Sequence, residues 1–333
     1  MLPSGWFARL VLAASFLCAI LLVLDLLFIT PGPASLLASN SLDLVVVVIA
    51  CICCYAAAKR SSGYARQIWL LLGVALTLES LAQAISTYYQ SFYPSAAGTP
   101  WPSDVLFFVW AAPGFMILLP RSDEQYSGID SLRLLDFLQV AIVAVTLYVY
   151  FFYAPLRWKT DQASLLREIL VLYIVRDCIL SLAFLYRSRR PSPAWLRTCS
   201  AVLSVVFVGT AIASSDYLFT LSYNVGAATW GDFLFVLPYI VLIYFSLKWT
   251  PPESVPTSPA VSRFGTMVAT QILPVTIPLI VILMGRSIAK EQLLFAWILV
   301  AASVLCSSVR LILTNRRQRK IADDLLNTER ALR

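Results

Sequence analysis

Long apolar runs alternate with short polar segments along nearly the whole chain. A helix needs about 20 mostly apolar residues to cross about 30 Å of hydrocarbon. Runs of about this length lie at residues 6–30, 41–58, 68–89, 103–120, 134–154, 164–186, 195–223, 230–249, 265–285 and 292–314. We therefore predict an all-α, polytopic membrane bundle of about ten transmembrane helices within residues 1–314.

Basic residues gather in alternate loops, and this sets the orientation of the predicted spans. Lys59 and Arg60 follow the second span, and Arg187 and Arg189 follow the sixth. If both termini are cytoplasmic, most of the 25 Lys and Arg residues lie on the cytoplasmic side, as the positive-inside rule requires. The net charge of +7 then reflects threading and attraction to anionic lipid. The lipid bilayer is the expected partner, and no nucleic-acid partner is expected.

The composition agrees with a membrane location and removes many kinds of catalytic site. Hydrophobic residues make up 59% of the chain and charged residues 13%, whereas soluble domains carry about 25% charged residues. The chain contains no histidine, so it cannot by itself build a His-based triad, a His-ligated zinc site or a His-ligated haem. It also lacks a Walker-type loop and a GxGxxG motif. We expect no catalytic residues, metal or cofactor within this chain.

Two parts of the chain are similar to each other at a separation of about 128 residues. The segment SDVLFFVWAAP at 103–113 matches GDFLFVLPYI at 231–240, with Asp104 aligned with Asp232. Both aspartates begin a span, where an acidic side chain caps a helix and complements its dipole. We predict an internal parallel repeat of four helices, with units at about 6–120 and 134–249 and two further helices at 265–314.

Several polar residues fall inside apolar spans, where lipid would leave their groups unsatisfied. Glu79, Gln83, Ser86 and Gln90 recur on one helix face. Other polar side chains lie in the sixth and seventh spans, namely Arg176, Asp177, Thr210, Ser214 and Tyr217. These groups either pair with each other, for example Arg176 with Glu79 or Asp177, or form a pocket for an unknown small ligand or membrane cue. The candidate ligand-binding residues are Glu79, Gln83, Ser86, Arg176, Asp177 and Tyr217.

The segment after the last span reads as a helix that continues out of the membrane. Ile321, Leu325, Thr328 and Leu332 are spaced by four, three and four residues, the spacing of a coiled-coil seam. We predict that residues 315–333 form a coiled-coil-like signalling helix, which pairs two copies of the chain as a homodimer and leads to an output domain. The alternative is a frayed cytoplasmic tail with a basic, lipid-facing patch.

Three apolar segments and this tail resemble the N-terminal multi-helix sensor regions of bacterial signalling proteins. The segments are DVLFFVWAAPGFMILLP at 104–120, SLRLLDFLQVAIVAVTLYVYFFYAP at 131–155 and GDFLFVLPYIVLIYFSLKW at 231–249. In that group such a bundle precedes a GGDEF-type diguanylate cyclase or a histidine kinase. The resemblance implies an inner-membrane sensory module whose output enzyme, a cyclase rather than a kinase, would lie beyond Arg333. The chain itself contains no GGDEF, EAL or kinase motif.

A polytopic transporter or permease is the alternative function. The same polar face would then line a path for a solute, and a cytoplasmic tail helix would not be needed. Because the sequence shows no pair of Gly/Pro-interrupted helices at mid-membrane, which often marks a transporter binding site, a receptor fits the pattern at least as well.

Overall fold

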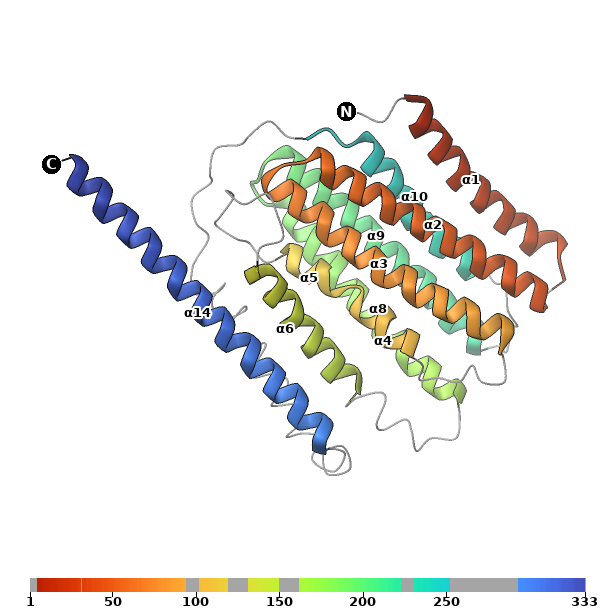
Figure 1. Cartoon of the computed structure of the whole chain (residues 1–333). Coiled ribbons are helices and arrows are strands. Elements are labelled where there is room, and N and C mark those ends of the chain that lie inside the picture. The colour runs from red at the N-terminus through yellow and green to blue at the C-terminus, as the bar shows by residue number, and fades with distance from the viewer. Residues whose placement is uncertain are drawn as a thin grey trace. The chain divides into compact units, whose positions relative to one another are not determined.

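A computed structural model describes residues 5–30, 32–93, 102–118, 131–149, 162–222, 230–251 and 293–332. Every regular element among these residues is a helix, and none is a strand. The helices are α1 (Gly5–Phe28), α2 (Pro33–Arg60), α3 (Gly63–Phe92), α4 (Pro102–Val109), α5 (Ala112–Leu118), α6 (Ser131–Tyr148), α8 (Gln162–Arg189), α9 (Ala194–Ser222), α10 (Trp230–Lys248) and α14 (Leu293–Leu332) (Figure 1).

Seven of the described helices are long and apolar enough to cross a membrane: Trp6–Phe28, Pro33–Arg60, Gly63–Phe92, Leu166–Arg189, Ala194–Thr220, Trp230–Lys248 and Trp297–Arg316. They correspond to seven of the predicted spans. The predicted span at 265–285 lies outside the described residues, and α6 covers only part of the one at 134–154. The chain is therefore an all-α, multi-pass membrane protein, while the count of ten spans stays a prediction.

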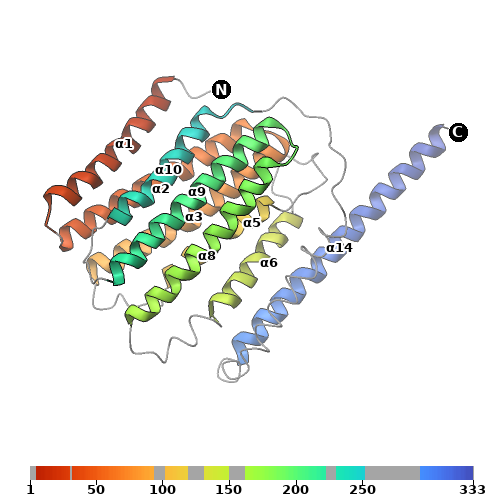
Figure 2. The ribbon, with the colours of Figure 1, turned by 180° about the vertical axis from the view of Figure 1, so that it is seen from behind.

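The described helices belong to two compact units. The first unit comprises Met1–Gly128 and Phe152–Pro259, and the second comprises Ile129–Phe151 and Ala260–Arg333. In the first, α2 packs on α3, α8 on α9, and α10 lies between α2 and α9, as Figures 1 and 2 show from opposite sides. In the second, α6 packs against α14. Helix α6, which we expected in the second four-helix repeat, is thus grouped with α14.

Three helices of the first unit begin about 130 residues before three others. Helices α2, α3 and α4 are followed, about 130 residues later in each case, by α8, α9 and α10. The two sets run in the same order, although α10 is continuous where α4 and α5 are separate. The four-helix repeat itself stays a prediction.

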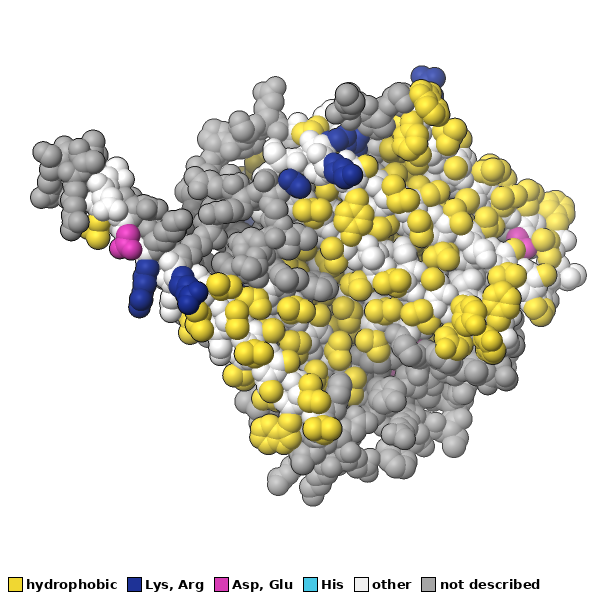
Figure 3. Space-filling view, in the orientation of Figure 1, with side chains coloured by type: hydrophobic (Ala, Val, Ile, Leu, Met, Phe, Trp, Pro, Cys, Tyr) yellow, Lys and Arg dark blue, Asp and Glu magenta, His cyan; other side chains and the backbone are white. Residues whose placement is uncertain are grey.

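The first unit has apolar sides and one end where basic side chains gather. Large apolar side chains such as Phe28, Ile52 and Leu182 are more than half exposed, as expected of groups that face lipid. Lys and Arg side chains gather where α2 ends (Figure 3). Arg60 at the end of α2 donates a hydrogen bond to the Ser246 carbonyl of α10 at 2.7 Å. We call this the basic end of the first unit; α3 and α9 begin there, and α2, α8 and α10 finish there.

The predicted span at 103–120 is not one helix, and here the sequence interpretation was incomplete. Helix α4 stops at Val109, and α5 begins at Ala112 after a turn at Trp110 and Ala111. Pro113 explains the break, because its ring and missing N–H are tolerated in the first turn of a helix but disrupt a helix interior. A Pro-interrupted helix is therefore present in the first unit, although the sequence pattern did not indicate one.

Helices α9 and α10 approach each other closely at a glycine. A Cβ atom placed on Gly209 would lie 2.5 Å from Cγ of Pro238, inside the distance that two carbons tolerate. We expect Gly209→Ala to destabilise the protein by about 1–3 kcal/mol through overpacking, which thermal unfolding in detergent would detect. In a Pro238→Ala background the same change should cost much less, because the ring that causes the clash is gone. An equal loss in both backgrounds would contradict this account.

Candidate functional site: an acidic cavity in the first unit

A cavity of about 320 Å³ lies inside the first unit, with walls from α2, α3, α4, α8, α9 and α10. All six candidate ligand-binding residues, Glu79, Gln83, Ser86, Arg176, Asp177 and Tyr217, line it, as do Thr210 and Ser214. We call it the acidic cavity after its five carboxyl residues, Asp43, Glu79, Asp104, Asp177 and Asp232. The tertiary structure thus brings residues from spans that are distant in the sequence into the wall of one cavity.

The acidic cavity extends from the middle of the bundle toward the end opposite the basic end. Glu79 and Arg176 lie near the midpoints of α3 and α8. Gln90 and Thr220, which also line the cavity, lie close to the last residues of α3 and α9. Since α3 and α9 begin at the basic end, their last turns mark the other end of the unit.

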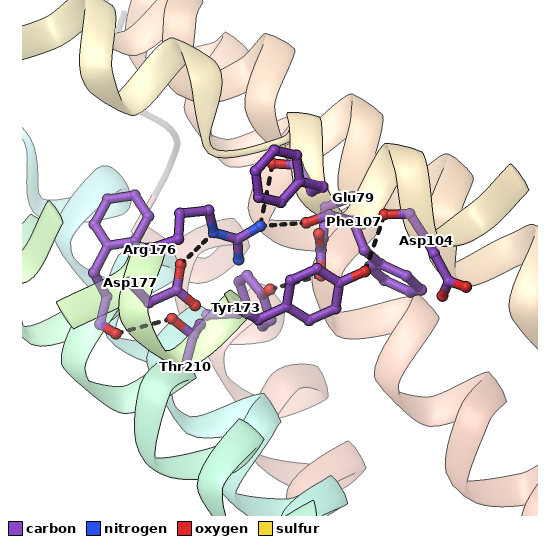
Figure 4. Close-up of polar contacts among 10 residues, drawn as sticks. Glu79, Asp104, Phe107, Tyr173, Arg176, Asp177 and Thr210 are labelled. Atoms are coloured by element: carbon purple, nitrogen blue, oxygen red, sulfur yellow. Dashed lines mark hydrogen bonds and ion pairs between the residues drawn. The ribbon is translucent and has the colours of Figure 1, made fainter. Parts of the chain in front are cut away.

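Arg176 is buried in the wall of the cavity and has several partners (Figure 4). Its Nε donates to Asp177 Oδ1 at 2.7 Å, and its Nη1 donates to the carbonyl oxygens of Phe107 and Phe108. These carbonyls belong to the last turn of α4, where a helix leaves its C=O groups without intrahelical partners. The guanidinium also lies over the rings of Tyr173 and Trp110, 5.0 and 5.4 Å from their centroids. Arg176 therefore supports the break between α4 and α5.

The sequence left two partners open for Arg176, Glu79 or Asp177, and in the structure Arg176 pairs with Asp177. This ion pair is almost fully buried, with 7% of Arg176 and 1% of Asp177 exposed. Glu79 instead accepts a hydrogen bond from the Tyr239 hydroxyl at 3.2 Å. Its Oε2 atom is buried and has no hydrogen-bond partner. Pairing within the bundle accounts for Arg176 and Asp177 but leaves one oxygen of Glu79 unused.

A hydrogen-bonded group of polar side chains lines the cavity toward the end opposite the basic end. Gln90 Nε2 donates to Ser86 Oγ at 2.9 Å, and Asn40 Nδ2 donates to Gln90 Oε1 at 3.0 Å. Ser86 and Gln90 belong to the polar face predicted on α3, whereas Asn40 comes from α2. These contacts hold α2 and α3 together where the helices leave the apolar core.

Helix α2 supplies residues that the sequence interpretation missed. The predicted span began at residue 41, but α2 begins at Pro33 and includes the polar run SNSLD at 39–43. Asp43, which is 3% exposed, lines the cavity, and its Oδ1 atom has no hydrogen-bond partner. Asn40 and Asp43, three residues apart, share a helix face, and this spacing was the signal available in the sequence.

Asp104 and Asp232 occupy the helix starts expected of them. Both lie in the first turn of their helix, α4 and α10, where a negative charge complements the helix dipole. Asp232 also accepts a hydrogen bond from Ser39 Oγ at 2.7 Å. The backbone carbonyl of Asp104 accepts one from the Tyr173 hydroxyl at 2.9 Å. Both residues line the cavity as well.

The predicted signalling helix falls in the second unit. Helix α14 runs from Leu293 to Leu332 without a break, so Ile321, Leu325, Thr328 and Leu332 all lie on it. Thr328 is exposed, and the side chains of the other three are outside the described part of the structure. Gln139 of α6 donates a hydrogen bond to Ser307 of α14 at 2.6 Å.

Comparison with protein families, curated proteins and solved structures finds no match to this chain. The structure by itself defines a class, an all-α, multi-pass membrane protein with a polar cavity inside its helical bundle.

Proposed function

We propose that the chain is a membrane-embedded sensory input module, in which a cue binds in the acidic cavity and α14 relays the signal to a cytoplasmic output domain. The observation that carries this proposal is the continuity of α14. One helix of 40 residues contains both the span Trp297–Arg316 and the polar segment up to Leu332. A helix of this length extends about 60 Å, twice the thickness of the hydrocarbon, so it is suited to transmit movement out of the membrane.

In this proposal the basic end of the first unit and the end of α14 face the cytoplasm of a bacterial inner membrane. The positive-inside rule supports that orientation. The acidic cavity then reaches toward the opposite side, from which a cue would enter. A ligand that binds one of two helix packings more tightly shifts the population toward it, and the shift would reach α14 as a rotation or a sliding movement. The proposed output is a diguanylate cyclase rather than a histidine kinase, working in a homodimer paired through α14.

One observation favours the second candidate, a transporter. Broken helices inside a membrane are tolerated where they line a cavity, and transporters place substrate sites beside them. The break between α4 and α5 lies next to the acidic cavity, since Phe107 and Trp110 both line it. A transporter of this kind would move a solute into sealed vesicles that contain the purified chain alone.

Changing the helical phase of the tail tests the sensory function. The full chain would be joined through Arg333 to a diguanylate cyclase domain, and cyclic diguanylate would be measured in cells. An insertion of two residues between Lys320 and Ile321 turns the following helix by about 200°, whereas seven residues restore the phase to within about 20°. We expect the first insertion to change output at least about fivefold, the range of allosteric coupling, and the second to leave it near the starting value. Equal output from all three proteins, with solute uptake into vesicles, would favour the transporter.

A further inference from the structure

We infer that the acidic cavity binds a small organic ammonium ion. This inference rests on the proposed function only in identifying the cavity as the place where a cue binds. It names the chemical class of the ligand from the charges, the unused hydrogen-bonding groups and the walls of the cavity.

The balance of charge in the cavity favours a cation. Among the described lining residues, five carry carboxyl groups and one, Arg176, carries a guanidinium. That guanidinium is already paired with Asp177. Asp43 and Asp232 both line the cavity, and Ser39, one helical turn before Asp43, donates a hydrogen bond to Asp232; two neighbouring carboxyl groups disfavour two negative charges. A bound cation relieves this repulsion, whereas an anion would increase it.

Two buried carboxyl oxygen atoms in the wall of the cavity have no hydrogen-bond partner. Glu79 is fully buried and Asp43 is 3% exposed, and each has one carboxyl oxygen without a hydrogen-bond partner. Both residues line the cavity. A buried polar atom without a partner is costly, and a buried charge needs a compensating group. An ammonium group supplies both the positive charge and up to three N–H donors.

The size and walls of the cavity favour an organic cation over a metal ion. A volume of about 320 Å³ is at the lower end of the range for small-molecule pockets. Among the described residues, no three His, Cys, Asp or Glu side chains converge as metal ligands would. Aromatic side chains of Phe107, Trp110, Tyr173, Tyr217 and Phe235 line the cavity. Aromatic faces attract cations, and Arg176 already lies against two of these rings.

The geometry assigns a role to each part of the cavity. Glu79, near the middle of the bundle, accepts the ammonium group while its other oxygen keeps the hydrogen bond from Tyr239. The aromatic side chains surround the apolar body of the ligand. Ser86, Gln83 and Gln90, nearer the end of α3, contact any second polar group.

Binding to the purified full chain in detergent tests the inference. The probes are n-butylamine, 1,4-diaminobutane and 2-phenylethylamine, each compared with the alcohol in which hydroxyl replaces the amino group, and sodium and potassium chloride serve as metal-ion probes. We expect at least one amine to raise the melting temperature and to bind at least tenfold more tightly than its alcohol, because charge-assisted hydrogen bonds are about twice as strong as neutral ones. If no amine exceeds its alcohol, or if sodium or potassium alone gives the same stabilisation, the inference is wrong.

Variants of the two carboxylates locate the site. Glu79→Gln keeps an oxygen that accepts from Tyr239 but removes the ionisable carboxyl group, and it should weaken amine binding at least tenfold. Asp43→Asn tests the other unpartnered carboxylate if the first variant does not fold. Asp216→Asn is the matched control, because Asp216 lies on α9 outside the cavity lining. Amine binding that survives both Glu79→Gln and Asp43→Asn would place the ligand elsewhere and overturn the inference.

The outcomes for ligand class and for function are separable. Amine binding without any effect on the output of the cyclase fusion would support the ligand and reject the sensory function. An output that depends on helical phase, combined with no amine binding, would support the sensory function and reject the ligand.

Discussion

Arg176→Met is expected to be the most damaging single substitution in the first unit. The change leaves the Asp177 carboxylate buried without its partner, and it removes the donor that serves the carbonyl groups of Phe107 and Phe108 at the end of α4. Removing one partner of a buried ion pair lowers the free energy of unfolding by about 3–5 kcal/mol. We expect little monodisperse protein after size-exclusion chromatography in detergent, and a strongly lowered melting temperature for what remains.

Two further variants distinguish the effect of the unpaired Asp177 charge from the effect of losing an arginine side chain. Arg197→Met removes an exposed arginine at the start of α9 and should leave the melting temperature close to that of the unmodified protein. Adding Asp177→Asn to Arg176→Met should recover part of the loss, because the unpaired buried charge is then absent. If Arg176→Met melts like the unmodified protein, the ion pair does not support the bundle as described.

Trp69→Ala is expected to have the second largest effect, at the basic end of the first unit. Trp69 is fully buried, and its ring lies 5.4 Å from Trp249 and 5.7 Å from Phe245 between centroids. Replacing a buried tryptophan with alanine costs about 3–5 kcal/mol. In a membrane this cost comes mainly from lost van der Waals contacts, because lipid tails are as apolar as the side chain. Heating followed by size-exclusion chromatography would measure it.

The indole N–H of Trp69 makes this prediction more specific. It is buried and has no hydrogen-bond partner, so Trp69→Phe removes an unsatisfied donor while it keeps an aromatic ring. We expect Trp69→Phe to be much milder than Trp69→Ala. Trp6→Ala, at an exposed position of α1, is the control and should have almost no effect on the melting temperature. Equal losses for alanine and phenylalanine at position 69 would show that packing is not the cause.

The sequence was most informative about the helices and about the polar residues within them. Hydropathy alone locates a span, because each transmembrane helix must satisfy its backbone hydrogen bonds within itself. Seven predicted spans reappear as described helices, six of them with both ends within about five residues and α2 with a start eight residues earlier than predicted. The period of the α-helix also placed Glu79, Gln83 and Ser86 on one face, and all three line the same cavity.

The errors of the sequence interpretation have a common cause in local hydropathy. The start of α2 was placed too late because Ser39 and Asn40 are polar, although Ser39 is hydrogen-bonded to Asp232 across helices. The break after α4 was missed because hydropathy does not distinguish Pro113, which disrupts a helix interior, from its apolar neighbours. In both places a partner far away in the sequence determines whether a polar group or a broken helix is tolerated.

Pattern along the chain thus determined which segments cross the membrane and which side chains are too polar to face lipid. Only the tertiary structure decided that Arg176 pairs with Asp177 rather than Glu79, that α2 contributes Asp43 to the cavity, and that one oxygen of Glu79 has no partner. The physical reason is that hydropathy and helical period depend on neighbours within a few turns. Hydrogen bonds and ion pairs between helices need two atoms within a few ångströms of each other. The residues that carry those atoms are often far apart in the sequence.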